Sequence, residues 1–176
     1  MSRRVFEEVV VPHLDAAFNY ARWLTRNDAD AQDVVQDAYV KALRFFSSLR
    51  DDDARAWLLT IVRNTWYSRF SRHRGLELPV AFDVGTDARS DDTLDPEALL
   101  MQRQTVEAVR CAIEALPADF REVIVLRELE GLSYKEIAAV VGIPIGTVMS
   151  RLARGRERLL AVLGSSVVME GHRDVS

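Results

Sequence analysis

Apolar residues recur along most of the chain at spacings of three and four residues, which is the period of an α-helix. This spacing predicts helices over residues 5–25, 29–46, 54–72, 96–116, 117–130 and 133–141, and one more helix that begins near residue 145. Sustained alternation of apolar and polar residues between turn dipeptides, which is typical of strands, does not occur. The pattern therefore predicts an all-α fold without a sheet.

Residues 132–159, LSYKEIAAVVGIPIGTVMSRLARGRERL, contain two of the predicted helices and a tight turn between them. Ser133 and Glu136 have the spacing of a capping box at the start of the first helix. Gly142 supplies a positive φ at the end of that helix, and Pro144 prevents it from continuing. Two short helices joined in this way form a helix-turn-helix pattern.

The second helix of this hairpin has an apolar stripe and a basic stripe. The apolar stripe predicts the buried face and consists of Val148, Leu152, Gly155 and Leu159. The adjacent outward stripe lies about 100° away and consists of Thr147, Arg151, Arg154 and Arg158. Such an arginine run is often only a solvated helix face. Small and hydroxyl residues near the start of the helix favour DNA binding instead, because they let the backbone approach a major groove.

The length and the single cysteine of the chain limit the class of protein. A chain of 176 residues can form one ordinary domain or two small ones. Cys111 alone cannot form an internal disulfide or a multi-cysteine zinc site, and its apolar helical surroundings predict a buried thiol. The apolar runs are too short to cross a bilayer and no signal peptide is recognisable, so we expect a cytoplasmic protein without membrane insertion.

Charge is unevenly distributed along the chain, although the net formal charge is only −4. Residues 54–75 contain five arginines and no acid, whereas residues 76–98 contain seven acids and one arginine. The acidic stretch also lacks helical periodicity, so it predicts an acidic flexible linker over 76–97. The predicted organisation is two small helical domains and a flexible tail, over residues 1–75, 98–164 and 165–176.

Two helices in the first half carry candidate binding residues. The helix over 29–46 has an outward strip, Asp33, Gln36, Asp37 and Lys41, which is either a solvated face or a docking site for another protein. The helix over 54–72 mixes arginines with aromatic residues. This mixture suits single-stranded nucleic acid, because arginines follow phosphates while unpaired bases stack on rings. The alternative is that the rings only pack the core.

Three segments in order, DAQDVVQDAYVKA, AWLLTIVRN and ALPADFREVIVLRELEGLSYKEIAAVVGIPIGTVMSRLARGRERL, resemble the bacterial extracytoplasmic-function (ECF) sigma factors. The resemblance covers residues 5–163, with the linker unmatched. It implies a first domain that docks on the clamp helices of RNA polymerase and melts the minus-ten promoter element. It implies a last domain that reads the minus-thirty-five element. The implied partners are core RNA polymerase, promoter DNA and an anti-sigma factor, with no catalytic residue, metal or cofactor.

The resemblance also implies roles for residues at matching positions. Polymerase docking is expected from Asp33, Gln36 and Asp37. Contacts with minus-ten DNA are expected from Trp57, Ile61 and Asn64, with the arginines Arg63, Arg69 and Arg72 on the backbone and the 47–53 loop around a flipped-out base. Contacts with minus-thirty-five DNA are expected from Gly146, Thr147, Ser150, Arg151 and Arg154. The chain departs from the usual family pattern at Met149, at Ser68 and at the RDDD run over 50–53. Because of these departures, the resemblance does not predict which promoter sequence the chain recognises.

Two other classes of protein fit part of the pattern. An ordinary regulator with a sensory first domain and a C-terminal helix-turn-helix would use only double-stranded DNA, and the arginine-aromatic segment at 63–74 argues against it. An enzyme would need Asp51, Asp52 and Asp53 as metal ligands. No glycine-rich phosphate loop, HExxH motif or nucleophile–base set accompanies these carboxylates. The sequence therefore favours a sigma factor.

Overall fold

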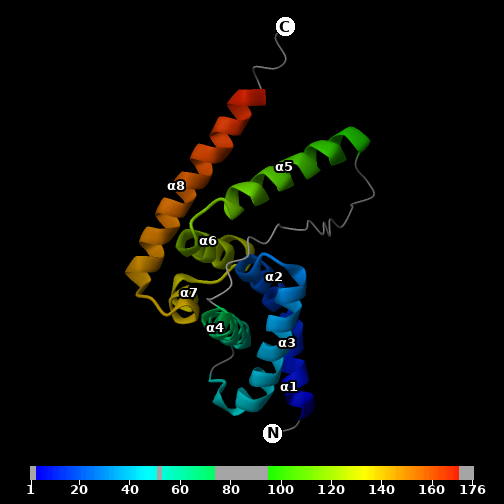
Figure 1. The fold of residues 1–176 in the computed structure, drawn as a ribbon, viewed down its shortest axis with the longest axis vertical. Helices are drawn as coiled ribbons and strands as arrows, with labels where there is room; N and C mark the ends of the chain where they lie inside the picture. Colours follow the sequence, from blue (N-terminus) through cyan, green and yellow to red (C-terminus); the bar gives the residue numbers. More distant parts are fainter. Residues whose placement is uncertain (1–2, 51–52, 74–94, 171–176) are drawn as a thin grey trace.

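The computed structural model of the protein describes residues 3–50, 53–73 and 95–170. Helices and short turns account for these residues, and none of them lies in a strand, so the all-α prediction is confirmed. They form a first domain, residues 3–73, and a second domain, residues 95–170 (Figure 1). Most of the predicted linker lies outside the described residues, and the second domain begins with a helix at Pro96.

The first domain is built from α1 (Arg3–Val10), α2 (Leu14–Thr25), α3 (Asp28–Phe45) and α4 (Ala54–His73). Helices α2, α3 and α4 pack against one another. Small residues of α3, Ala38 and Ala42, are fully buried and allow this close packing. Asn27 caps α3, because its side-chain oxygen accepts a hydrogen bond from the Asp30 amide at 3.0 Å.

The prediction of one helix over residues 5–25 was wrong, because the α-helical hydrogen bonding is interrupted between α1 and α2. A 3-10 turn, Val11–His13, separates these helices and contains Pro12. Proline has no amide hydrogen and its ring clashes with the preceding turn, so it interrupts a continuous α-helix. A second 3-10 turn, Phe46–Ser48, follows α3 and directs the chain toward α4.

The second domain is built from α5 (Pro96–Glu114), α6 (Ala118–Ile124), α7 (Tyr134–Val141) and α8 (Ile145–Glu170). A π-helical turn, η3 (Val125–Leu129), extends α6, so the segment predicted as one α-helix over 117–130 changes its hydrogen-bonding pattern at Val125. The backbone of α8 stays helical to Glu170, which is within the segment for which a flexible tail was predicted.

One expectation about an individual surface differs from the structure. Cys111 is exposed rather than buried, because the face of α5 that packs inward carries Ala112, Ile113 and, just beyond the helix, Leu116. Within the described residues no single helix has the length and apolarity to cross a membrane. One sharply bent pair, Tyr134–Val141 with Ile145–Gly164, meets those criteria by length and composition alone.

The two domains contact each other through α4 and α2 of the first and α7 and η3 of the second. Figure 1 shows α6 and α7 between the first domain and the diverging helices α5 and α8. Because the contact uses α4, the helix with the arginine-aromatic mixture, the environment of its side chains depends on the second domain.

Candidate nucleic-acid and polymerase interfaces

The predicted helix-turn-helix is present as α7, a tight turn and α8. The Ser133 hydroxyl accepts a hydrogen bond from the Glu136 amide at 3.3 Å, and the Glu136 carboxylate accepts one from the Ser133 amide, so the capping box is confirmed. Gly142 ends α7 with φ at +74°, as predicted. These local signals lie within a few residues of one another, which is why the sequence alone specifies the hairpin.

Helix α8 is positioned by its apolar stripe, in which Val148 and Leu152 are buried. Gly155 is also buried, and it allows α8 to approach Ile124 of α6 closely. The residues predicted to read minus-thirty-five DNA lie outside this stripe on the first turns of α8. The exposed ones are Gly146, Ser150 and Arg154, and the partly exposed ones are Thr147 and Arg151. These five residues therefore form one accessible surface at the start of α8.

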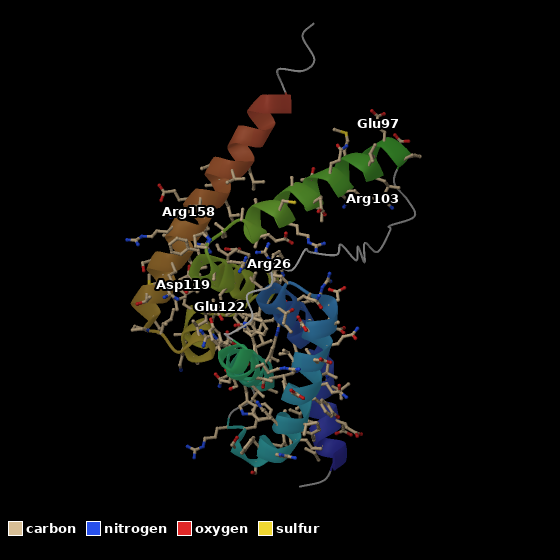
Figure 2. All side chains as sticks on the ribbon, in the orientation of Figure 1. Arg26, Glu97, Arg103, Asp119, Glu122 and Arg158 are labelled. Carbon is tan, nitrogen blue, oxygen red and sulfur yellow. The ribbon has the colours of Figure 1, made fainter. Side chains whose placement is uncertain are left out.

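Several arginines of α8 have partners within the second domain. Arg151 forms an ion pair with Asp119 at 3.1 Å, and Arg158 lies over the Phe120 ring, 5.0 Å from its centroid (Figure 2). Arg156 pairs with Glu128 at 2.6 Å, and both side chains of that pair are close to half exposed. Such exposed pairs exchange easily with solvent and with phosphate, so they leave this surface available to DNA.

The predicted polymerase-docking strip lies on the outer face of α3. Asp33, Gln36 and Asp37 are all exposed. Arg69 of α4 pairs with Asp37 at 3.1 Å and reaches Asp33 at 3.6 Å. One residue predicted for DNA thus contacts two residues predicted for polymerase, which sequence spacing could not show because α3 and α4 meet only in the folded domain.

The other residues predicted to bind minus-ten DNA occupy different environments on α4. Asn64 is exposed, whereas Trp57 and Ile61 are partly buried and pack against the core. The Trp57 ring meets the Phe46 ring edge-on at 6.4 Å, so part of its surface stabilises the domain. The Arg72 side chain, and residues 51–52 of the loop predicted to hold a flipped-out base, lie outside the described residues.

Arg63, also predicted to bind minus-ten DNA, faces the second domain. Its Nε donates to Glu122 Oε1 at 2.7 Å, and the Tyr20 hydroxyl donates to the same oxygen at 2.7 Å. Burial raises the pKa of Tyr20 well above its ordinary value, and the neighbouring Glu122 charge raises it further. The guanidinium of Arg63 also lies over the Tyr67 ring, 4.4 Å from its centroid. Glu122 lies in the helix predicted over 117–130. Nothing in the apolar spacing of that helix indicates that Glu122 pairs with Arg63.

A second set of contacts between the domains lies at the start of α4. Arg55 donates through Nη2 to Glu130 Oε2 at 2.7 Å, and burial of Glu130 raises the pKa of its carboxyl despite that pair. Asp53 caps α4 by accepting a hydrogen bond from the Ala56 amide at 3.0 Å. Burial raises the pKa of Asp53, and the neighbouring Glu136 raises it further. The N-terminal ends of α4 and α7 therefore place two carboxyl groups beside each other.

The packing between the domains is incomplete. A cavity of about 70 Å³ lies where α2 and α4 meet α6 and η3. Its walls include Tyr20, Trp66 and Tyr67 from the first domain and Arg121 and Glu122 from the second. Close-packed cores contain few voids larger than a water molecule, so this part of the contact is packed less tightly than the surrounding core, which includes buried residues of both domains.

Two family models match the chain in the positions of the two domains. Sigma-70 region 2 matches residues 9–75, and sigma-70 region 4 matches residues 106–159. The first match contains the acidic strip of α3 and the arginines of α4. The second contains the helix-turn-helix.

Characterised relatives and solved structures agree with these matches. The ECF RNA polymerase sigma-E factor of Escherichia coli is 38% identical over 138 residues, which cover 74% of this chain and 72% of that protein. The ECF RNA polymerase sigma factor SigE of Mycolicibacterium smegmatis is 31% identical over 154 residues. That match covers 88% of this chain and 60% of SigE, so the chain spans less than two thirds of that relative.

Among solved structures, the sigma factor RpoE in complex with the anti-sigma factor NepR from Bartonella quintana superposes with a TM-score of 0.72 at 29% identity, over 92% of this chain and 98% of RpoE. CnrH in complex with the cytosolic domain of CnrY superposes with a TM-score of 0.61 at 28% identity, over 93% of this chain and 90% of CnrH. The domains, their order and the helix-turn-helix agree with these proteins. The chain belongs to the ECF sigma factors of RNA polymerase, within the sigma-70 family.

Proposed function

We propose that this chain binds core RNA polymerase in the cytoplasm and directs it to promoters, as a non-enzymatic initiation factor that recognises minus-ten and minus-thirty-five elements. The observation that carries this proposal is the pairing of an accessible, arginine-bearing helix-turn-helix with a separate domain that presents exposed acids on one helix and arginines on the next. An ordinary regulator needs only the first of these two surfaces.

The start of α8 is proposed to lie in the major groove of the minus-thirty-five element. Arg154 is exposed there, and Gly146 and Ser150 leave space beside it. Arginine side chains in this position of a helix-turn-helix can read guanine edges or hold phosphates. Arg151 can join them after it leaves Asp119, since that pair is at the surface.

The first domain is proposed to dock on polymerase through α3 and to hold melted minus-ten DNA along α4. Asp33, Gln36 and Asp37 are exposed together, and a basic partner can replace Arg69 in its surface pairs with the two acids. Asn64 is exposed on α4 and can hydrogen-bond the edge of an unpaired base. An anti-sigma factor is proposed as a further partner, because the related RpoE and CnrH are solved in complexes with NepR and CnrY.

Transcription with purified core polymerase tests the proposal as a whole. The chain should confer run-off transcription on a subset of genomic promoters, whereas an ordinary regulator should not change the promoter choice of core polymerase alone. Binding of core polymerase then tests the α3 strip. Reversal of Asp33 and Asp37 to lysine should abolish binding, while the free energy of unfolding should change by less than about 1 kcal/mol, as at other surface sites. Reversal of two exposed acids elsewhere, Asp15 and Glu97, is the matched control.

The role of Asn64 in melting is tested with two promoter templates. Unstacking and unpairing a base costs a few kcal/mol, so a residue that holds such bases matters most on duplex DNA. Asn64→Ala should therefore reduce open-complex formation on a duplex promoter more than on one with a pre-melted bubble. Equal losses on the two templates would place the melting role on other residues.

A further inference from the structure

The outer face of the first domain holds an arginine against the two acids of the docking strip. Arg69 of α4 donates through Nη1 to Asp37 Oδ2 at 3.1 Å, and its Nη2 lies 3.6 Å from Asp33 Oδ2. The two acid side chains are 59% and 55% exposed, and that of Arg69 is 36% exposed, so both pairs are at the surface. In the free chain, a residue predicted to bind DNA therefore occupies the two carboxylates predicted to bind polymerase.

Repulsion between the two acids favours a cation at this position. Asp33 and Asp37 are one helical turn apart on α3, where like charges destabilise each other. Lys41 lies one turn further along α3, but its Nζ donates to the Thr65 hydroxyl at 3.1 Å. The planar guanidinium of Arg69 has several donors and can serve two carboxylates at once, whereas an ammonium is a point charge. Arg69 is therefore well suited to hold both acids.

Arg69 also lies beside the face of α4 that is proposed to hold melted DNA. Asn64 and Ser68 are exposed on that face and are one turn apart, and Arg69 follows Ser68 directly. The guanidinium is carried on a long, flexible stem, so from this edge of α4 it can reach either the α3 carboxylates or a phosphate beside Asn64. Both acids belong to the same domain as Arg69, so this choice does not involve the second domain.

We propose that Arg69 is exchanged when polymerase docks: a basic group of the polymerase takes its place on Asp33 and Asp37, and the released guanidinium binds a phosphate of the melted minus-ten strand. This inference rests on the proposed functions of α3 and α4. Surface ion pairs contribute little free energy, so a partner with further contacts displaces Arg69 at small cost. The paired donors of a guanidinium recognise a phosphate as they recognise a carboxylate.

The exchange has two consequences for binding. Arg69 competes with polymerase for the acids, so it weakens docking of the free chain. Asp33 and Asp37 compete with DNA for Arg69, so they weaken DNA binding until polymerase occupies them. Because coupling between two binding sites is reciprocal, DNA that holds Arg69 strengthens docking by the same factor by which docking strengthens DNA binding.

A double-mutant cycle on the full chain without polymerase tests the effect on DNA. Fluorescence anisotropy with a labelled single-stranded DNA pool of random sequence, at low salt, measures binding. Asp33→Asn/Asp37→Asn releases Arg69 and should tighten binding about two- to fivefold, the range of surface ion pairs. Arg69→Ala should weaken binding less than about twofold in the unmodified chain, but should remove the whole gain in the asparagine background. Asp15→Asn/Glu97→Gln, which removes two exposed acids elsewhere, is the matched control background, and Arg69→Ala should act there as in the unmodified chain.

Competition for a limiting amount of core polymerase tests the effect on docking. Arg69→Ala should compete about two- to fivefold better than the unmodified chain, because the acids no longer have to release a cation. Arg69→Gln, which keeps a polar side chain without the charge, should change competition in the same direction. Arg26→Ala, which removes an exposed arginine at the C-terminal end of α2, should compete as the unmodified chain does. An arginine that only supported the fold would weaken docking when removed, and circular dichroism checks that each variant is folded.

Equal losses on Arg69→Ala in the unmodified and asparagine backgrounds would overturn the proposal, as would unchanged or weaker competition by the folded Arg69 variants. These outcomes are distinguishable from a failure of the proposed function. If the unmodified chain binds core polymerase and supports promoter-specific transcription but the cycle shows no coupling, the sigma role stands and the exchange is wrong. If the unmodified chain does not bind core polymerase, the proposed function itself fails.

Discussion

Helices α4 and α8 both present arginines, but the two sets have different surroundings. On α8, Arg151 and Arg156 pair with acids of their own domain, and the acid in each pair is about half exposed or more. On α4, Arg55 and Arg63 pair with acids of the other domain that are almost fully buried. The same residue type on two predicted basic helices therefore gives one open surface and one covered surface.

This difference shows that the burial of the acid paired with each arginine, more than the arginine itself, determines whether a basic helix is an open or a covered surface. An exposed ion pair contributes little to stability and yields easily to a phosphate. A buried pair costs several kcal/mol when one member is removed, because the remaining charge loses its compensation. Separating α4 from the second domain therefore includes the cost of breaking these buried pairs, whereas the exposed pairs of α8 carry no comparable cost.

The largest predicted effect compares the two kinds of pair directly. Glu122→Ala should lower the free energy of unfolding by about 3 kcal/mol, because it leaves Arg63 and the Tyr20 hydroxyl without their acceptor in a buried site. Glu128→Ala should lower it by less than about 1 kcal/mol, because the pair with Arg156 is exposed. Urea unfolding followed by circular dichroism measures both values. Similar losses in the two variants would remove the distinction between the covered and open surfaces.

Local signals predicted much of the fold. The Ser133 and Glu136 capping box and the positive φ of Gly142 each depend on residues within one or two turns, and the structure contains both. The break at Pro12 was missed even though proline is a helix breaker, because the apolar spacing continues through it. The hydrophobic pattern and the proline thus gave conflicting signals, and the proline prevailed.

Contacts distant in the sequence could not be predicted in the same way. Tyr20 and Glu122 are separated by 102 positions, and Arg63 and Glu122 by 59. Periodicity assigns Glu122 to a helix and says nothing about which helix of the other domain covers it. For the same reason the sequence predicts that the α4 arginines are available to DNA. In the folded chain, two of them form ion pairs with acids of the second domain.

The second prediction concerns the open surface and separates base reading from phosphate contact. Arg154→Ala should weaken binding to minus-thirty-five DNA by about 1–3 kcal/mol for the cognate sequence if the side chain reads a base. If it contacts only phosphate, the loss should be equal for all sequences and the salt slope should fall by about one. Asp119→Asn should strengthen binding slightly, because it releases Arg151. Unchanged affinity of a folded Arg154→Ala variant would exclude this residue from the interface.

The third prediction tests how α8 is held in place. A Cβ added at Gly155 would lie 2.8 Å from Ile124 Cγ1, and Ile124 is fully buried and cannot move aside freely. Overpacking of this kind costs about 1–3 kcal/mol, and the better helix propensity of alanine recovers up to about 1 kcal/mol. Gly155→Ala should therefore lower the free energy of unfolding by about 1–2 kcal/mol. Gly164→Ala, where the added atom meets open space, should raise it slightly. A higher melting temperature for Gly155→Ala would show that α8 shifts at no cost.

The smallest predicted effect is a pH dependence of the closed arrangement. Burial raises the pKa of Asp53 and of Glu130, so each carboxyl binds its proton more tightly when the domains are together. Their contribution to closure is present at low pH and is lost as the pH rises through their raised pKa values, which lie above 3.8 and 4.5. The hydrogen bonds of Ser133 lower the pKa of Glu136, but both residues belong to the capping box of α7, so this effect does not depend on the contact between the domains. Mild acidification should therefore favour closure.

Spin labels on Cys111 and on a cysteine that replaces Gln32, both exposed, report the distance between the domains and measure this dependence. Between about pH 7 and about pH 5 the closed fraction should rise by an amount equivalent to less than about 1 kcal/mol, since Asp53 is only partly buried and Arg55 lowers the pKa of Glu130 against the effect of burial. The double variant Asp53→Asn/Glu130→Gln retains hydrogen-bonding groups at both positions and should lose the dependence. His13 also faces Asp53 and lowers its pKa through its positive charge. A His13→Asn variant should therefore still close on acidification, and a flat profile in that variant would assign the dependence to the imidazole instead of the two carboxyls.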